Sequence, residues 1–184
     1  MTILPFDEIN RMKGDIPIFL NENGVIRSEA DEREFVEELE DLFLLCYANG
    51  AESARQDLGK DIPADIQDVE DTIYQPVAGK VWTERIHEYL QSGTIADIER
   101  VIDTEAHRIT NEAGYNTAVR GGAKMKVWNC MLLDTSRDTH IDLDGVSAPI
   151  DGYFYTYLGN HAMYPGQFGV AEEDVNCLCW LTYK

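Results

Sequence analysis

The hydrophobic positions in the first two thirds of the chain follow the period of α-helices. Between residues 29 and 58, apolar side chains recur at i, i+4, i+7, i+8 and i+11, which places them on one helix face. Ser28 precedes this segment and is a suitable N-cap, and acidic residues crowd the first turns, where the helix dipole favours them. The predicted core-facing residues are Phe35, Leu39, Leu42, Phe43 and Cys46.

Three shorter helices are predicted to follow. Pro63 is expected to open the second helix, and Pro76 separates it from the third, which ends at Ser92-Gly93. Thr94 is expected to cap the fourth, with Asp97 three residues later as in a capping box. The residues expected to face inward are Ile66, Val69 and Ile73, then Val77, Val81, Ile86 and Leu90, then Ile95, Ile98, Val101, Ile102 and Ile109.

Glu105 interrupts the apolar stripe of the fourth helix. It lies seven residues after Ile98 and four before Ile109. Either it is a surface residue at the edge of the stripe, or it is buried and pins the helix to the C-terminal domain, because a buried carboxylate needs a partner. The amide of Asn111 could make the same kind of link.

The first 28 residues carry no clear period. Pro5, Gly14 and Pro17 punctuate them, and Asn23-Gly24 is a turn signal. We therefore expect an extended arm over residues 1–28, of the kind that a partner orders.

The period changes after Gly121-Gly122. Residues 125–133, 153–158 and 175–183 read as strands, separated by turn-rich segments that include Asp144-Gly145. The predicted fold class is α+β: an N-terminal helical region, residues 29–122, packed on a small, mostly antiparallel β domain, residues 123–184.

Charge excludes several classes of protein. The formal net charge is −19, of which −15 falls on residues 1–122 and −4 on the rest. A surface this acidic repels nucleic acid, so general nucleic-acid binding is excluded, because that binding relies on Lys and Arg at phosphates. No apolar run is long enough for a membrane helix, and the first residues do not resemble a secretory signal. The four scattered cysteines indicate a reducing compartment.

The residues with the clearest chemistry are His140, Cys177 and Cys179. In a strand, residues i and i+2 share a face, so the two thiols would point the same way. Two thiolates and an imidazole can bind zinc, with Asp134, Asp142, Cys130 or water as the fourth ligand. The alternative is two buried core cysteines and a hydrogen-bonded histidine.

Four acids near His140 suggest a second kind of chemistry. Asp134, Asp138, Asp142 and Asp144 could hold a divalent cation or form an acid/base pair with the imidazole. Aspartates in a D-x-D-G segment also serve tight turns. The chain has no nucleophile elbow, P-loop or dinucleotide-binding glycine pattern, so we do not predict an enzyme.

Several short segments, in this order, resemble the phage Mu protein F-like family of minor head proteins, also called phage head morphogenesis proteins. Two departures stand out, because Asp103 and Leu178 occupy positions where the family usually has Arg. The segments run from Ile102 to Leu181: Asp103-Thr104-Glu105 with Asn111; Lys126-Val127-Trp128; Asp134, Arg137 and His140; Leu143-Asp144-Gly145; Pro165-Gly166; and Glu172 to Cys179, which includes Asn176.

The resemblance implies a structural role in phage head morphogenesis at the portal vertex, with a part in DNA packaging or delivery. The implied partners are the portal protein, the major capsid protein and a scaffold, in the virion or in the host cytoplasm during assembly. It implies no catalytic residue, and it makes the cysteines and histidine a structural or metal-binding set. The family domain is also found fused to toxin domains, so the alternative is a metal-dependent nuclease or toxin-like effector that uses His140 with Asp134 and Asp142.

Overall fold

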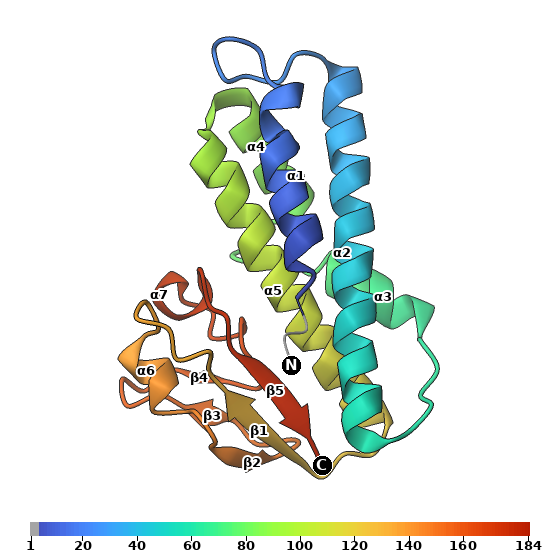
Figure 1. The fold of residues 1–184 in the computed structure, drawn as a ribbon, viewed down its shortest axis with the longest axis vertical. Helices are drawn as coiled ribbons and strands as arrows, with labels where there is room; N and C mark the ends of the chain where they lie inside the picture. The colour runs from blue at the N-terminus through green and yellow to red at the C-terminus, as the bar shows by residue number, and fades with distance from the viewer. Residues whose placement is uncertain (1–3) are drawn as a thin grey trace.

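The computed structural model describes residues 4–184 as a helical bundle with a small β region beside its lower end (Figure 1). The long helices are α1 (Phe6–Phe19), α2 (Glu29–Leu58), α4 (Trp82–Ser92) and α5 (Ile95–Arg120), and α3 (Ile66–Ile73) is shorter. The remaining elements are β1 (Met125–Asn129), α6 (Asp138–Ile141), β2 (Ser147–Pro149), β3 (Phe154–Tyr155), β4 (His161–Ala162), α7 (Ala171–Asp174) and β5 (Trp180–Tyr183). This confirms the predicted α+β class.

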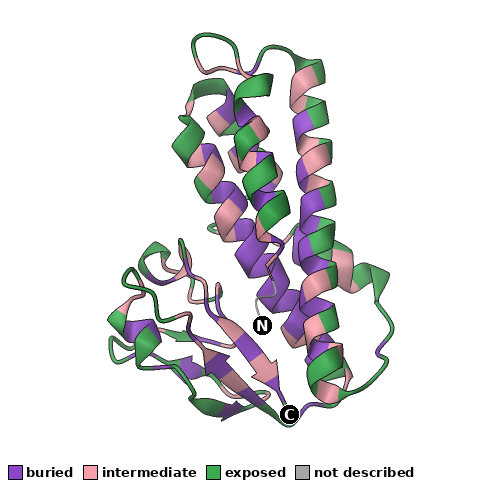
Figure 2. Cartoon of the chain, viewed as in Figure 1, coloured by how far each residue is buried: buried purple, intermediate pink, exposed green. Residues whose placement is uncertain are grey.

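Helix α5 connects two hydrophobic cores. Its first half faces the core that the helices share, and its last turns reach a second core formed mainly by residues after 122. Ala54 of α2 and Ala118 of α5 belong to this second core, so the β region packs directly on the ends of both helices. The middle of α5, residues 105–114, is consequently buried around its whole circumference (Figure 2).

Helix α2 forms as the pattern predicts. The Ser28 hydroxyl accepts a hydrogen bond from the backbone N–H of Asp31, and Gly59 ends the helix in the left-handed conformation that glycine adopts easily. All five predicted core residues of this helix are buried. A Cβ added to Gly50 would lie 2.0 Å from the carbonyl oxygen of Thr110, so glycine is what allows α2 to cross α5 this closely.

The expected extended arm is wrong for residues 6–19, which form helix α1. Pro5 precedes the helix and Pro17 lies in its last turn, so neither proline breaks its middle. Ile9, Met12 and Ile16 are buried on one face of α1, against the bundle. The turn at Asn23-Gly24 is confirmed, because Gly24 has a φ of 75° and Leu20 pairs with Ile26.

Two helix starts differ from prediction. Helix α3 begins at Ile66 after an Asp65 cap rather than at Pro63, and Ile66 itself is exposed. Helix α4 begins at Trp82, because a tight turn with positive φ at Ala78 and Gly79 comes first. Val77 and Val81 therefore precede α4, and Ile95, at the start of α5, is exposed.

The strands are shorter than predicted. The chain leaves β1 after Asn129 and turns at Leu132, whose φ is 52°. Strand β1 lies between β2 and β5 in an antiparallel sheet, with Trp128 opposite Leu181, and β3 pairs with β4 in a second sheet. Residues 175–179 form a loop that leads into β5, so the two cysteines do not lie in a strand.

Within residues 4–184, no helix combines the length and the apolar character that crossing a bilayer requires.

Candidate metal centre

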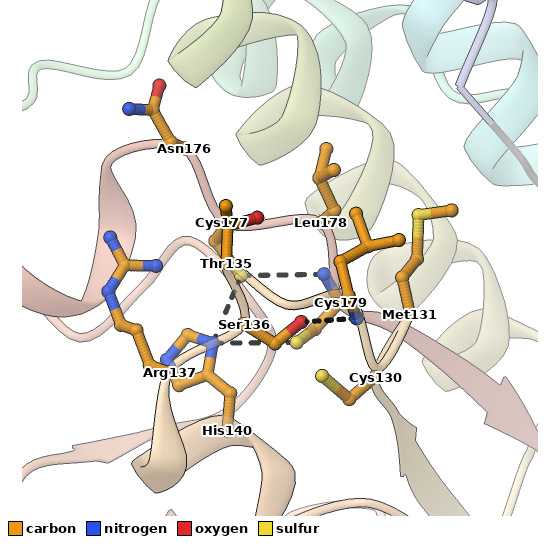
Figure 3. Close-up of a pocket in the computed structure, with 11 residues that line it drawn as sticks. Cys130, Met131, Thr135, Ser136, Arg137, His140, Asn176, Cys177, Leu178 and Cys179 are labelled. Carbon is orange, nitrogen blue, oxygen red and sulfur yellow. Dashed lines mark hydrogen bonds between the residues drawn. The ribbon is translucent and has the colours of Figure 1, made fainter.

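His140, Cys177 and Cys179 come together below α5, as Figure 3 shows. The Nδ1 atom of His140 lies 3.4 Å from each of the two Sγ atoms. One ligand atom from each residue lies within 4.8 Å of the others, and all three side chains are buried. The residues thus form a group that could bind a metal ion, one of the two alternatives that the sequence left open. The same distances also fit the other alternative, two buried cysteines and a hydrogen-bonded histidine.

The two nitrogen–sulfur distances are close to those that a bound zinc ion would impose. With bond lengths of about 2.3 Å to sulfur and about 2.0 Å to nitrogen, tetrahedral zinc holds these atoms about 3.6 Å apart. The cavity that the three side chains line has a volume of about 20 Å³, which is room for one small ion or one water molecule. Hydrogen bonding to Cys177 and burial raise the pKa of the Cys179 thiol, and a bound cation would reverse this by favouring thiolates.

The other ring nitrogen of His140 faces a buried carboxylate. Its Nε2 atom lies 3.1 Å from Oε2 of Glu173, in a contact that is not aligned as a hydrogen bond. The Thr139 hydroxyl and the Asn160 amide donate to the two oxygens of Glu173 at 2.8 and 3.0 Å and hold it in place. Metal-binding histidines commonly have a carboxylate on the nitrogen away from the metal, so this arrangement also fits a metal centre.

The acidic residues predicted around His140 do not join the group. Asp134, Asp138 and Asp142 are exposed, so Asp134 and Asp142 are not ligands in this geometry. Asp144 has a different role, because its Oδ1 accepts a hydrogen bond of 2.8 Å from the backbone N–H of Cys130. The turn function that we gave as the alternative is thus the one this aspartate serves.

The remaining motif residues position the loops around the group. The Arg137 guanidinium donates to the carbonyl oxygen of Val175, and Asn176 adopts a φ of 56°, a conformation that asparagine tolerates. Together they turn the chain so that Cys177 points inward. Trp128 packs edge-on against the His140 ring at a centroid distance of 5.6 Å, and Gly145, with a φ of 76°, donates to the Trp128 carbonyl.

Two buried side chains of α5 attach it to the cysteine loop. Asn111 donates to the carbonyl oxygen of Cys179 at 3.2 Å, as the sequence allowed. His107 Nε2 lies 2.7 Å from the same oxygen, and burial lowers the His107 pKa to about 4, so the ring is neutral. The sequence did not point to His107, which lies off the apolar stripe. Gly166 brings the Pro165-Gly166 loop so near α5 that an added Cβ would lie 3.2 Å from Cα of Arg108.

Glu105 is fully buried, but its partners are not in the C-terminal region. Arg85 of α4 donates to one carboxylate oxygen at 2.5 Å, and Arg108 donates to the other at 2.9 and 2.7 Å. Of the two alternatives for Glu105, a surface position is wrong because the side chain is buried, and a link to the C-terminal domain is also wrong, since this carboxylate links α5 to α4.

Lys126 is a buried charged residue whose burial the hydrophobic pattern did not predict. Its side chain is fully buried, with Nζ 4.8 Å from the centre of the Tyr115 ring and 5.4 Å from that of Phe154. None of the ion pairs found among the described residues includes it. Burial lowers its pKa to about 8.

Comparison with known proteins gives two relatives. The chain is 40% identical over 84 residues to the NAD(+)--arginine ADP-ribosyltransferase EFV of Enterococcus faecalis. The aligned region covers 44% of this chain and 17% of that protein. It is 29% identical over 103 residues to Minor head protein GP7 of Bacillus phage SPP1. This aligned region covers 54% of this chain and 33% of that protein.

The chain thus spans a third or less of the length of these relatives. No family model matches the chain. No solved structure matches it either. The similarity to GP7 gives loose support to the phage head family that the motifs resemble.

Proposed function

We propose that this chain is a structural protein of a phage head that acts through binding to other head proteins and not through catalysis. The observation that carries the proposal is the similarity to a phage minor head protein over about half of the chain. The motif residues support a structural role, because Asn111, Arg137 and Asn176 hold loops and helices together.

The acidic helix α2 is the surface that we assign to partner binding. Glu29, Glu34, Glu37 and Asp41 are exposed on its first half, and residues 1–122, which include α2, carry −15 of the net charge of −19. Opposite charge speeds association and orients partners. We therefore propose a basic face of the portal or major capsid protein as the partner, in the virion or during assembly in the host.

Co-purification tests this proposal. Tagged full-length protein is mixed with the portal and the major capsid protein encoded beside it, and we expect at least one to be retained at low salt. Glu34→Lys with Glu37→Lys should weaken retention. Glu22→Lys with Glu70→Lys changes the charge equally at exposed positions outside α2 and should leave retention intact. Failure to retain either partner contradicts the proposal.

We further propose that His140, Cys177 and Cys179 bind zinc as a structural ion. These residues would tie the cysteine loop to helix α6, and zinc would supply folding free energy to a region with little regular structure. Elemental analysis of protein purified without chelator should find one zinc per chain. Cys177→Ser should abolish it, whereas Cys46→Ser, at a buried cysteine of the helical core, should not.

The alternative function is a metal-dependent nuclease or effector, and the similarity to an ADP-ribosyltransferase fits it in part. The geometry favours the structural role, because one ring nitrogen of His140 faces two thiols and the other faces Glu173. A nuclease assay with added zinc or magnesium separates the two functions. Cleavage that disappears in His140→Ala, in a variant that keeps its fold, would favour the alternative.

A further inference from the structure

Cys130, one of the candidates for a fourth ligand, lies beside the candidate metal centre. It lines the same cavity of about 20 Å³ as His140, Cys177 and Cys179. Ser136 lines the same cavity, and Figure 3 shows the Cys130 sulfur directed toward that of Cys179. The side chain is 8% exposed, so the thiol faces the cavity and not the solvent.

The backbone of Cys130 is fixed in this position. Its N–H donates to Asp144, and the loop that follows is closed by a hydrogen bond of 2.9 Å from the Leu133 N–H to the Ser136 hydroxyl. Leu132 adopts a positive φ of 52°, which folds residues 130–136 back over the cavity. Figure 3 shows the Cys130 sulfur beside the group of three, which does not include it, so sharing an ion would require the Cys130 side chain to move toward His140 and Cys177.

We propose that Cys130 is the fourth ligand of the zinc ion, which makes the centre a closed Cys₃His site. The inference rests on the proposed zinc site and decides its type. Four protein ligands are typical of structural zinc, whereas catalytic zinc keeps one position open for water.

Two observations favour Cys130 over the other candidates for the fourth position. Asp134 and Asp142 are exposed and do not line the cavity, whereas Cys130 is buried and lines it. A cavity of about 20 Å³ leaves little room for a water molecule beside an ion, because a single water molecule needs roughly 10–15 Å³. A thiolate already at the wall of the cavity can reach the ion without that extra room.

Cobalt(II) substitution of the full-length protein tests the proposal. Cobalt bound by thiolates absorbs in the near ultraviolet with an intensity that grows with the number of thiolates. We expect the wild-type protein to show three thiolates per cobalt. Cys130→Ser should lower the absorbance by about one third, as two of three thiolates remain. Cys46→Ser, which removes an equally buried thiol elsewhere, should not change it.

The possible results separate this inference from the zinc site itself. A two-thiolate spectrum that Cys130→Ser leaves unchanged overturns the role of Cys130 and keeps the site of three residues. No uptake of cobalt or zinc by the wild-type protein overturns both. X-ray absorption of the zinc-bound wild-type protein needs no variant: three sulfurs and one nitrogen support the proposal, and two sulfurs contradict it.

Discussion

Lys126 provides the sharpest test of how the C-terminal core is built. Its ammonium group is buried against the faces of Tyr115 and Phe154, and nearby Met163 contributes a sulfur 3.9 Å away. Aromatic faces attract the cation, but they do not replace water fully. Lys126→Met keeps the unbranched chain and removes the charge, so we expect the variant to be more stable than the wild type at pH 7.

The size of this stability difference follows from the pKa of Lys126. Burial lowers that pKa from 10.5 to about 8 in the folded protein. Between these values the unfolded chain binds more protons, so stability rises as the pH increases from 8 to 10.5. A difference of roughly 2.5 units at about 1.4 kcal/mol each gives about 3 kcal/mol. The stability advantage of Lys126→Met should shrink by up to this amount over that range.

Urea unfolding followed by tryptophan fluorescence at pH 7, 8, 9 and 10 measures the difference between the two proteins. Comparison with the variant cancels the titration of all other groups. Lys124→Met is the control, because Lys124 is exposed two residues earlier and is hydrated in both states. The reasoning would be refuted if the difference in unfolding free energy between Lys126→Met and the wild type stayed constant across the pH range.

Three further predictions concern the bundle, the α5 attachment and the metal. Gly50→Ala should cost about 3 kcal/mol of unfolding free energy by forcing α2 from α5, whereas Gly14→Ala, with open space around it, should stabilise the protein slightly. The pKa of His107 is lowered to about 4 in the folded protein, so the unfolded chain binds more protons between pH 6.5 and pH 4. The free energy of unfolding should therefore fall by roughly 3 kcal/mol as the pH is lowered over this range. Urea unfolding of His107→Gln should show a smaller fall. Chelation of zinc should expose residues 123–184 to proteolysis while circular dichroism retains the bundle helices.

The sequence predicts a helix well where a single face of that helix packs against a single hydrophobic core. Helix α2 has a capping serine, a regular apolar stripe and a glycine stop, and all of these signals agree. Helix α1 was missed because Pro5, Gly14 and Pro17 suggest irregular structure, although both prolines lie at tolerated positions near its ends. The stabilisation of α1 comes from its contact with the bundle, which a local pattern does not contain.

The candidate site was predicted for a reason that is only partly right. We expected Cys177 and Cys179 to share a face of a strand, but they lie in a loop, and their thiols meet because Asn176 turns the chain. The burial of His107 and Lys126 was not predicted, because both are polar residues in elements that are covered on both sides. Their burial depends on the packing of the β region against α5, which involves contacts distant in sequence.

The central claim is that this chain belongs to a phage head. Mass spectrometry of purified virions of the phage or prophage that carries its gene tests this most directly. The account predicts its peptides in intact, salt-washed particles. Its complete absence from virions that contain the portal and capsid proteins would contradict the account.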